Sequence, residues 1–300
     1  MNSRLLVRIA VLLVNVLAWV MLTSAAIGQD VQREQTTLKI MTYNIRYDNP
    51  GDGLNSWNNR KDFVSALMQF HGADIICIQE GLLQQVHYLR DALKEFEFCG
   101  VGRDDGKEAG EYAAIFFRKS MFDQLAGSTF WLSPSPAQPG KGWDAALPRI
   151  VTWASLRFKS NGRSFVVFNT HFDHMGEIAR RESARLLRAQ IPRIAGDRPV
   201  IVTGDFNSTE QDSAYQILVK PMSGIPLLKD SYGISRQPHY GITPTFFGFD
   251  ARTTDPGERI DFVFVSDRVI VLRHGTLSDF RDGRFPSDHL PVLVEIALPE

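Results

Sequence analysis

The stretch Val200-Ile201-Val202-Thr203-Gly204-Asp205-Phe206-Asn207 decides how the rest of the chain is interpreted. Its first four residues are β-branched and mostly apolar, which predicts a buried β-strand. The strand then ends in Gly204, Asp205 and Asn207, so two polar side chains lie at the rim of a sheet, where catalytic groups are often found. A simple turn is the alternative, because Gly-Asp-x-Asn also suits an Asx-turn. The other strand ends decide between the two.

Apolar segments of this kind recur along the chain and predict an α/β protein. Besides the central strand, strands are expected at 38–44, 74–79, 96–102, 112–117, 150–158, 164–169, 259–265, 269–272 and 292–298. Helices are expected at 57–70, 83–93, 177–195 and 213–219, with the five arginines of 177–195 facing outward. No repeat or linker divides residues 36–300. We therefore expect one α/β domain there, most simply two sheets packed face to face and flanked by helices.

The first 28 residues differ from the rest. Arg4 and Arg8 precede an apolar run over residues 9–22, and Ala26 and Gly28 supply small residues at positions −3 and −1 of a cleavage site. These features predict a signal peptide over residues 1–28 and export to the periplasm or the medium. An uncleaved N-terminal anchor is the alternative, although the run is short for a membrane span. No later stretch is long enough to cross a membrane.

The composition is that of a globular protein, with 44% hydrophobic and 22% charged residues. Without the first 28 residues, which carry two arginines and no acid, 31 basic and 34 acidic residues remain and the net charge is −3. Such a surface does not favour nucleic-acid binding through bulk charge. Cys77 and Cys99 are too few for a disulfide scaffold. Whether they pair is open, since Cys77 also fits a small buried hydrophobic residue.

Polar residues occur at the ends of the predicted strands with a regularity that chance does not explain. They are Asn44, Glu80, His171 with Asp173, Asp205 with Asn207, Asp261, and Asp288 with His289. If these ends converge, they form a pocket of carboxylates, amides and imidazoles. No cysteine and histidine spacing typical of zinc is present. Carboxylate and amide oxygens suit a hard cation instead, Mg²⁺ or Mn²⁺.

Such a pocket supports attack by water on a phosphate ester, with a metal ion neutralising the phosphate oxygens. His289 is the predicted base, because the ordinary pKa of histidine lies near neutrality. The preceding aspartate points to the opposite side in an extended segment, so Asp261 is the expected partner of the ring. Asp205 is expected to orient the water. Asn207 and His171 are expected to donate hydrogen bonds to the phosphate oxygens.

Six segments together resemble the motif set of the endonuclease/exonuclease/phosphatase superfamily. They are Thr42-Tyr43-Asn44, Ile78-Gln79-Glu80, Asn169-Thr170-His171-Phe172-Asp173-His174, Gly204-Asp205-Phe206-Asn207, Arg259-Ile260-Asp261-Phe262 and Ser287-Asp288-His289-Leu290-Pro291. The superfamily includes deoxyribonuclease-I-like nucleases, apurinic-site endonucleases, neutral sphingomyelinases, inositol polyphosphate 5-phosphatases and deadenylases. Each motif is weak alone, but six in the family's order are specific and span almost all of the chain after the signal peptide.

Three more segments are similar to the deadenylase-like branch and its exported bacterial relatives. They are Leu147-Pro148-Arg149, Thr245-Phe246-Phe247-Gly248-Phe249 and Asp282-Gly283-Arg284-Phe285-Pro286. The sequence departs from the apurinic-site enzymes, since it lacks a recognisable basic loop that grasps DNA.

The resemblance implies a four-layer α/β sandwich, with two packed mixed β-sheets flanked by helices, and Mg²⁺-dependent hydrolysis of phosphoesters. It implies Glu80 as the principal metal ligand, with Asn44 and Asp288 nearby. The other implied roles are a pair of His289 with Asp261 on the side of the base, Asp205 as the residue that positions the nucleophile, Asn207 and His171 as phosphate contacts, and Asp173 as a support for the site.

Four further residues are candidates for substrate contact. Arg149 and Arg259 carry guanidinium groups that match phosphate, although either can equally form a salt bridge. His174 follows His171 by three residues and is a candidate for the wall of the site. Tyr112 precedes an apolar strand and either touches substrate or is a half-buried strand residue.

The leading hypothesis is an exported, Mg²⁺- or Mn²⁺-dependent phosphodiesterase or nuclease that uses a histidine-activated water. A secreted lipid or sugar phosphoesterase, similar to sphingomyelinases or inositol phosphatases, is the alternative. The expected partner is a phosphoester substrate, such as a nucleotide, RNA or DNA. The protein is expected to be a monomer without a stable protein partner. A non-catalytic binding protein on the same fold is a remote alternative, because it requires an essential group to be missing and none is.

Overall fold

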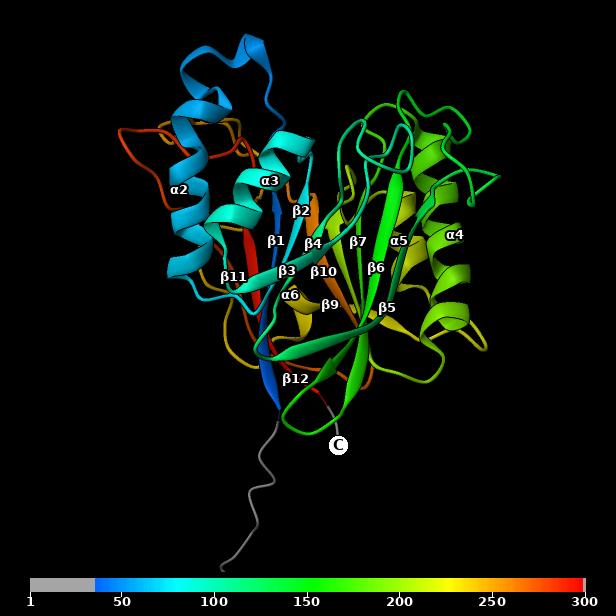
Figure 1. Ribbon diagram of the computed structural model, residues 1–300. Helices are drawn as coiled ribbons and strands as arrows, with labels where there is room; N and C mark the ends of the chain where they lie inside the picture. The colour runs from blue at the N-terminus through cyan, green and yellow to red at the C-terminus, as the bar shows by residue number, and fades with distance from the viewer. Residues whose placement is uncertain (1–35, 299–300) are drawn as a thin grey trace, which may run out of the picture. The chain divides into compact units, whose positions relative to one another are not determined.

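The computed structural model describes residues 36–298, and the predicted signal peptide lies outside this range (Figure 1). The first six-stranded sheet has the order β11–β12–β1–β2–β4–β3. Its strands are β1 (Thr37–Asn44), β2 (Ile75–Gln79), β3 (Phe96–Cys99), β4 (Ile115–Arg118), β11 (Ile270–Thr276) and β12 (Val292–Ala297). Only β1 and β2 are parallel neighbours, so the sheet is mixed.

The second six-stranded sheet has the order β5–β6–β7–β8–β10–β9. Its strands are β5 (Phe122–Trp131), β6 (Ile150–Phe158), β7 (Ser164–His171), β8 (Val200–Asp205), β9 (Leu228–Asp230) and β10 (Asp261–Ser266). Here β7 and β8 are the parallel neighbours and the other pairs are antiparallel. The central strand expected from the sequence therefore lies in the interior of this sheet.

Helices cover the outer face of each sheet, and Figure 1 shows α2 and α3 on one side and α4 and α5 on the other. The helices are η1 (Pro50–Asn55), α2 (Trp57–Phe70), α3 (Leu83–Ala92), α4 (Glu177–Ala195), α5 (Ser213–Val219) and α6 (Ser231–Ile234). One apolar cluster fills the space between the sheets, and two others join each sheet to its helices. The predicted four-layer sandwich is confirmed. No helix within residues 36–298 has the length and hydrophobicity needed to cross a bilayer.

Strand alternation explains how one segment serves two cores. Along β8, Ile201 faces the core between the sheets, whereas Val200 and Val202 face the helices. Because successive side chains of a strand point to opposite faces, a strand buried on both sides is apolar throughout. The same physics explains why β5 was missed from the sequence. It is an edge strand with an exposed middle, so it shows no apolar run.

Helix α4 corrects the expectation that all five of its arginines face outward. Arg188 is 1% exposed, and its guanidinium group donates to the backbone oxygens of Leu218 (2.7 Å) and Lys220 (3.0 Å). Arg188 of α4 thereby caps the C-terminal end of α5. Because a buried guanidinium group is tolerated only when carbonyl oxygens or carboxylates accept its N–H groups, helical periodicity alone did not reveal it.

Cys77 and Cys99 are free thiols. Both lie level with Ile115 of β4, Cys77 on one side and Cys99 on the other. Two strand spacings, about 9.5 Å, therefore separate their backbones, more than a disulfide spans. Burial raises the pKa of both thiols to about 12. The open question of their pairing is thus answered by the register of the sheet.

A polar network joins the two sheets close to the ends of β2 and β7. The buried amide of Asn169 donates to the backbone oxygens of Ile78 (2.8 Å) and Ala114 (2.9 Å) and accepts from Gln79 (2.7 Å). Thr203 of β8 donates to the same amide oxygen (3.3 Å). Since each amide hydrogen of Asn169 has an acceptor, the network fixes how the sheets are placed against each other.

Candidate active site

The neighbouring strands β7, β8 and β10 bring polar residues to the same level, where these strands begin or end in the second sheet. Asp205 lies opposite His171 in the β7–β8 pair and opposite Asp261 in the β8–β10 pair. Gly204 makes this close pairing feasible, because its φ is 152° and a Cβ there would lie 2.2 Å from the oxygen of Thr170. The glycine that breaks the apolar run thus lets the strand pair up to its catalytic end.

Asp261 and His289 form a buried hydrogen-bonded pair. Nδ1 of His289 lies 2.8 Å from Oδ2 of Asp261, which also accepts the hydroxyl of Thr245 at 2.7 Å. The aspartate is 1% and the histidine 4% exposed. A carboxylate that accepts from Nδ1–H fixes the ring orientation and directs Nε2 toward the site. The structure therefore contains the pair expected from the sequence.

The other nitrogen of His289 faces Asp205. Nε2 lies 3.7 Å from Oδ2 of Asp205, and both groups surround the amide of Asn44. Burial opposes a charge on the ring, but the carboxylates of Asp261 and Asp205 raise the pKa of His289 to about 10. Burial raises the pKa of Asp205, while the charge of His289 opposes this shift. At neutral pH the proton of the pair is therefore held by the imidazole ring.

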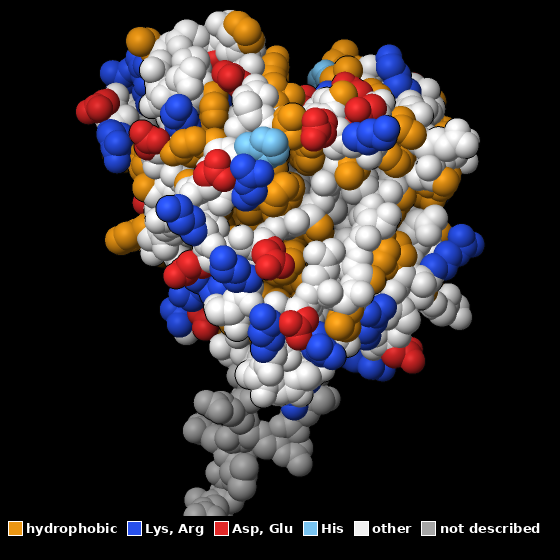
Figure 2. Space-filling view, in the orientation of Figure 1, with side chains coloured by type: hydrophobic (Ala, Val, Ile, Leu, Met, Phe, Trp, Pro, Cys, Tyr) orange, Lys and Arg blue, Asp and Glu red, His pale blue; other side chains and the backbone are white. Residues whose placement is uncertain are grey.

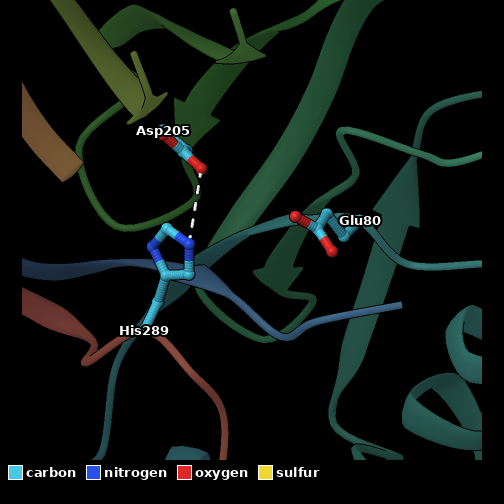
Figure 3. Close-up of side chains that lie close together, drawn as sticks. All are labelled: Glu80, Asp205 and His289. Carbon is cyan, nitrogen blue, oxygen red and sulfur yellow. Dashed lines mark ion pairs between the residues drawn. The ribbon is translucent and has the colours of Figure 1, made fainter. Parts of the chain in front are cut away.

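Glu80 faces this pair from the other sheet, as Figure 3 shows. It follows β2 in a left-handed backbone conformation with φ at 63°. Its carboxylate accepts the amide of Asn44 (2.9 Å) and the backbone N–H of Tyr47 (3.0 Å). One ligand atom each from Glu80, Asp205 and His289 lie within 4.8 Å of one another. The two carboxylates keep further lone pairs for a hard cation such as Mg²⁺ or Mn²⁺, whereas the protonated ring of His289 offers none.

The predicted metal neighbours Asn44 and Asp288 lie beside this group. Asn44 is fully buried and directs its amide nitrogen to the carboxylates, while its oxygen accepts the backbone N–H of Arg46 at 3.0 Å. In this orientation Asn44 holds Glu80 and Asp205 together. Asp288 lies 3.6 Å from the guanidinium group of Arg46, and burial raises its pKa. Their roles as metal ligands stay predictions.

His171 and Asn207 contact each other at the end of β7. The amide nitrogen of Asn207 donates to the oxygen of Phe172 (3.0 Å) and lies 3.1 Å from Nε2 of His171. Burial and the nearby charge of Arg149 lower the pKa of His171 well below its ordinary value. The neutral ring therefore accepts at Nε2 and carries its proton on Nδ1. In this tautomer His171 orients Asn207, and the donation of a hydrogen bond from His171 to phosphate stays a prediction.

Glu111 and Arg103 were not among the predicted site residues. Oε2 of Glu111 lies 2.6 Å from Arg103 and 3.8 Å from Nδ1 of His171. Burial raises the pKa of Glu111, although the charge of Arg103 opposes the shift. The carboxylate faces the proton of His171 and so supports its tautomer. The sequence signal was hidden in a charged loop, because neither residue ends an apolar run.

Asp173, the predicted support of the site, is held mainly by backbone N–H groups. Its carboxylate accepts backbone N–H groups from Ala146, Met175 and Gly176, the Gly176 bond measuring 2.8 Å. Burial opposes its charge, but these bonds lower the pKa of Asp173 to about 2. It also lies 3.3 Å from Nε of Arg149. Asp173 thereby fixes the loop before β6.

Arg149 and His174 reach the site as predicted. Arg149 is 3% exposed, and its guanidinium group lies 2.9 Å from Nδ1 of His174. One of its nitrogens, Nη1, is buried without a hydrogen-bond partner. Both residues line the cavity described below. An unpartnered guanidinium nitrogen suits an anionic substrate group.

For Arg259 and Tyr112 the structure shows the structural alternative that the sequence left open. Arg259 forms ion pairs of 2.5 Å with Glu210 and Asp230 and does not line the cavity. Side chains of adjacent residues in an extended segment point in opposite directions, so the preceding residue, Glu258, faces the cavity instead. The hydroxyl of Tyr112 donates to the oxygen of Lys107 (3.0 Å), so this tyrosine is a structural residue.

The active-site side chains surround a cavity of about 510 Å³ where the two sheets meet. Its lining residues are Arg46, Tyr47, Glu80, Glu111, Leu147, Arg149, His171, His174, Asp205, Asn207, Phe246, Glu258, Ile260, Asp288 and His289. Carboxylates outnumber guanidinium groups among them. On the molecular face of Figure 2, acidic and basic side chains are interspersed, without a continuous basic patch.

Comparison with known proteins agrees with this geometry. The model of the Endonuclease/Exonuclease/phosphatase family matches residues 41–289. The chain belongs to this family. It is therefore a hydrolase of phosphoester bonds, and the non-catalytic alternative is not supported, because Glu80, Asn44, Asp205, Asp261 and His289 are all present and in contact.

Solved structures from bacteria are similar over nearly their whole length. A family member from Bacteroides vulgatus is 41% identical, with a TM-score of 0.83, covering 88% of this chain and 100% of that one. The mannosyl-6-phosphatase of Bacteroides thetaiotaomicron is 38% identical, with a TM-score of 0.80, covering 86% and 99%. These likenesses confirm the fold.

Curated relatives include proteins of the deadenylase-like branch, as the sequence motifs indicate. Nocturnin of Drosophila melanogaster is 24% identical over 212 residues, which cover 64% of this chain and 31% of that protein. The Ccr4 exoribonuclease subunit of Saccharomyces cerevisiae is 21% identical over 308 residues, which cover 79% of this chain and 35% of that protein. The chain thus spans only about a third of these two proteins.

Proposed function

We propose that this protein is a phosphatase that removes phosphate from a small, sugar-like monoester with Mg²⁺ or Mn²⁺. The observation that carries the proposal is the continuous set of contacts from Asp261 through His289 and Asn44 to Glu80, beside a cavity of about 510 Å³. A cavity of this size is typical of sites that bind small molecules.

The metal belongs at Glu80. Glu80 is the partly exposed member of the group, and Asp205 and Asp288 add negative charge around the same cavity. A bound Mg²⁺ or Mn²⁺ would neutralise the phosphate oxygens and the departing oxygen. Asn44 holds the carboxylates of Glu80 and Asp205 at a fixed separation through hydrogen bonds of 2.9 Å to each.

The side chains then divide the chemistry between them. The oxygen of a water molecule forms a bond to phosphorus as the ester P–O bond on the opposite side breaks. Asp205, whose pKa is raised by burial, takes the water proton, and the leaving oxygen takes a proton from solvent. The imidazolium of His289 stabilises the charge that develops on phosphate. This assignment differs from the sequence prediction that His289 is the base, because its two carboxylate neighbours keep the ring protonated.

The substrate class rests on charge and on likeness. Nucleic acid is a polyanion, and the cavity is lined by five carboxylates: Glu80, Glu111, Asp205, Glu258 and Asp288. A small monoester brings one phosphate, which Arg149 and Arg46 can match. The relative described as a mannosyl-6-phosphatase is 38% identical over 99% of its own chain. We therefore place a sugar phosphate ahead of the nuclease substrate that the sequence motifs favoured.

A ribonucleotide or an RNA end is the second candidate. Phe246 is 37% exposed, and the centre of its ring lies 4.9 Å from that of His289, which offers a surface on which a base stacks. The likeness to Nocturnin and to the Ccr4 exoribonuclease subunit supports this alternative.

One experiment separates the two. The purified protein with Mg²⁺ or Mn²⁺ is supplied with mannose 6-phosphate, p-nitrophenyl phosphate, bis-p-nitrophenyl phosphate, an adenylate oligonucleotide and sphingomyelin. Release of inorganic phosphate from the monoesters, with little cleavage of the diesters, is the expected result. Preferential shortening of the oligonucleotide would favour the nuclease, and no hydrolysis with either metal would reject the proposal.

Export and a monomeric state complete the proposal. Export rests on the predicted signal peptide of residues 1–28, and the phosphatase domain is proposed to occupy residues 36–300. Cleavage after Gly28 in the secreting cell, read by mass of the mature N-terminus, tests the first statement. Light scattering of the purified protein tests the second.

A further inference from the structure

Arg60, in the first turn of α2, is a buried cation outside the cavity. Arg60 is 5% exposed, and its guanidinium carbon lies 5.1 Å from the centre of the Trp57 ring and 5.6 Å from that of Phe249. It forms no ion pair with a described carboxylate. Since burial of a charge is costly, as the lowered pKa of Arg60 indicates, its retention needs a structural reason.

The guanidinium group uses all five of its N–H donors on backbone oxygens. Nε donates to Asn55 (2.8 Å), Nη1 to Ile45 and to Pro286 (3.2 Å), and Nη2 to Arg46 (2.7 Å) and Tyr47 (3.5 Å). These oxygens belong to three segments of chain, namely 45–47, 55 and 286. A planar fork with five donors is a geometry that only arginine provides.

Two of these segments carry the active site. The carbonyl oxygens of 45–47 face Arg60, whereas the N–H groups of Arg46 and Tyr47 face Asn44 and Glu80, at 3.0 Å each. Pro286 lies two and three residues before the aspartate and histidine of the Ser-Asp-His motif. Arg60 therefore joins the backbone that orients Glu80 to the backbone that carries His289.

We propose that Arg60 is a positioning residue that sets the distance between the metal-binding carboxylate Glu80 and the Asp261–His289 pair. This inference rests on the proposed metal-dependent hydrolysis. A lysine at position 60 keeps the charge but has three N–H donors, so at least two of the five oxygens lose their partner. The backbone of 45–47 is then free to shift relative to Pro286, and Glu80 loses the fixed N–H of Tyr47.

Arg60→Lys is the test, with Arg188→Lys as the matched control. Arg188 is also buried, at 1% exposed, and also donates to backbone oxygens, but it joins α4 to α5. We expect Arg60→Lys to weaken Mn²⁺ binding by about tenfold or more in calorimetry without substrate, and to lower kcat by about tenfold. KM at saturating Mn²⁺ should stay within about threefold. Arg188→Lys should lower the melting temperature and leave Mn²⁺ binding and kcat unchanged.

The outcomes separate this inference from the proposed function. If the wild-type protein hydrolyses no phosphoester, the proposed function fails. If it does and Arg60→Lys binds Mn²⁺ and turns over like the wild type, the positioning role is overturned. Arg60→Gln, which keeps two N–H donors, is the second variant and should weaken Mn²⁺ binding further. Failure of both variants to fold would assign Arg60 a purely structural role and also reject the inference.

Discussion

Nδ1 of His289 lies 2.8 Å from Oδ2 of Asp261, although the two residues come from different segments and are 28 positions apart. Thr245 donates to the same oxygen, so the carboxylate is held on both sides. A buried carboxylate in this position both orients the ring and keeps it charged. The behaviour of the active site should therefore depend on this pair.

Replacement of Asp261 by asparagine should lower kcat by roughly 10²–10⁴-fold, because the ring loses its fixed tautomer and its charge. The measurement is the steady-state rate at saturating metal. Asp279→Asn is the control, since Asp279 pairs with His71 at 2.9 Å and neither residue lines the cavity of the active site. Equal losses in the two variants would show that the Asp261–His289 pair has no special role.

The pH profile of kcat should be bell-shaped. Asp205 must be ionised, and burial raises its pKa, so activity should fall on acidification already above the ordinary carboxyl range. His289 must be protonated, and its pKa is raised to about 10, so activity should fall as the pH rises through that value. In Asp261→Asn the largest charge that raises this pKa is removed, and the alkaline limb should move to lower pH. An unmoved alkaline limb would assign it to another group.

Glu80→Gln should abolish metal binding while leaving the fold intact. An amide oxygen carries no net charge, so a hard divalent cation loses its principal anionic ligand. We expect no measurable Mn²⁺ binding in calorimetry and a loss of at least about 10³-fold in activity. Glu97→Gln, on the exposed side of β3, is the control and should bind Mn²⁺ normally. Retained binding in Glu80→Gln would move the metal to other carboxylates.

Asn169→Leu should destabilise the domain by about 1–3 kcal/mol. The oxygen of Ile78 loses the Asn169 donor, while the oxygen of Ala114 and the amide of Gln79 each lose one of their partners, and a buried polar group left unpaired costs about 1–3 kcal/mol. Urea unfolding of the variant measures the effect. Asn58→Ala, at an exposed position of α2, should change stability by less than about 0.5 kcal/mol. A similarly small change in Asn169→Leu would show that the network between the sheets is dispensable.

Local pattern was sufficient for most elements of the sandwich. The apolar runs predicted the interior strands, and helices α2, α4 and α5 have the bounds that their periodicity indicates. Both signals are local, since a buried strand or an amphipathic helix records its surroundings in its own residues. The edge strand β5 shows no such pattern, because most of its middle residues are exposed and need not be apolar.

The strand ends likewise identified the polar groups but not their states. Asn44, Glu80, Asp205, Asp261 and His289 do converge, as their positions after apolar runs predicted. That His289 carries the proton follows only from two carboxylates that surround it in space. Glu111 likewise belongs to the site because it contacts His171 in space, and no sequence motif indicates it.

Asp205 illustrates which properties depend on the sequence and which depend on tertiary structure. Its place at the end of an apolar strand, after a glycine, was determined by the sequence alone, because strand burial and backbone freedom are local properties. Its raised pKa and its task in the reaction were decided by tertiary structure. His171 and Asp261 lie level with it only through strand pairing, and Asn44 reaches it from the other sheet across 161 positions. Electrostatic fields depend on distance in space, and that distance exists only once the two sheets have packed.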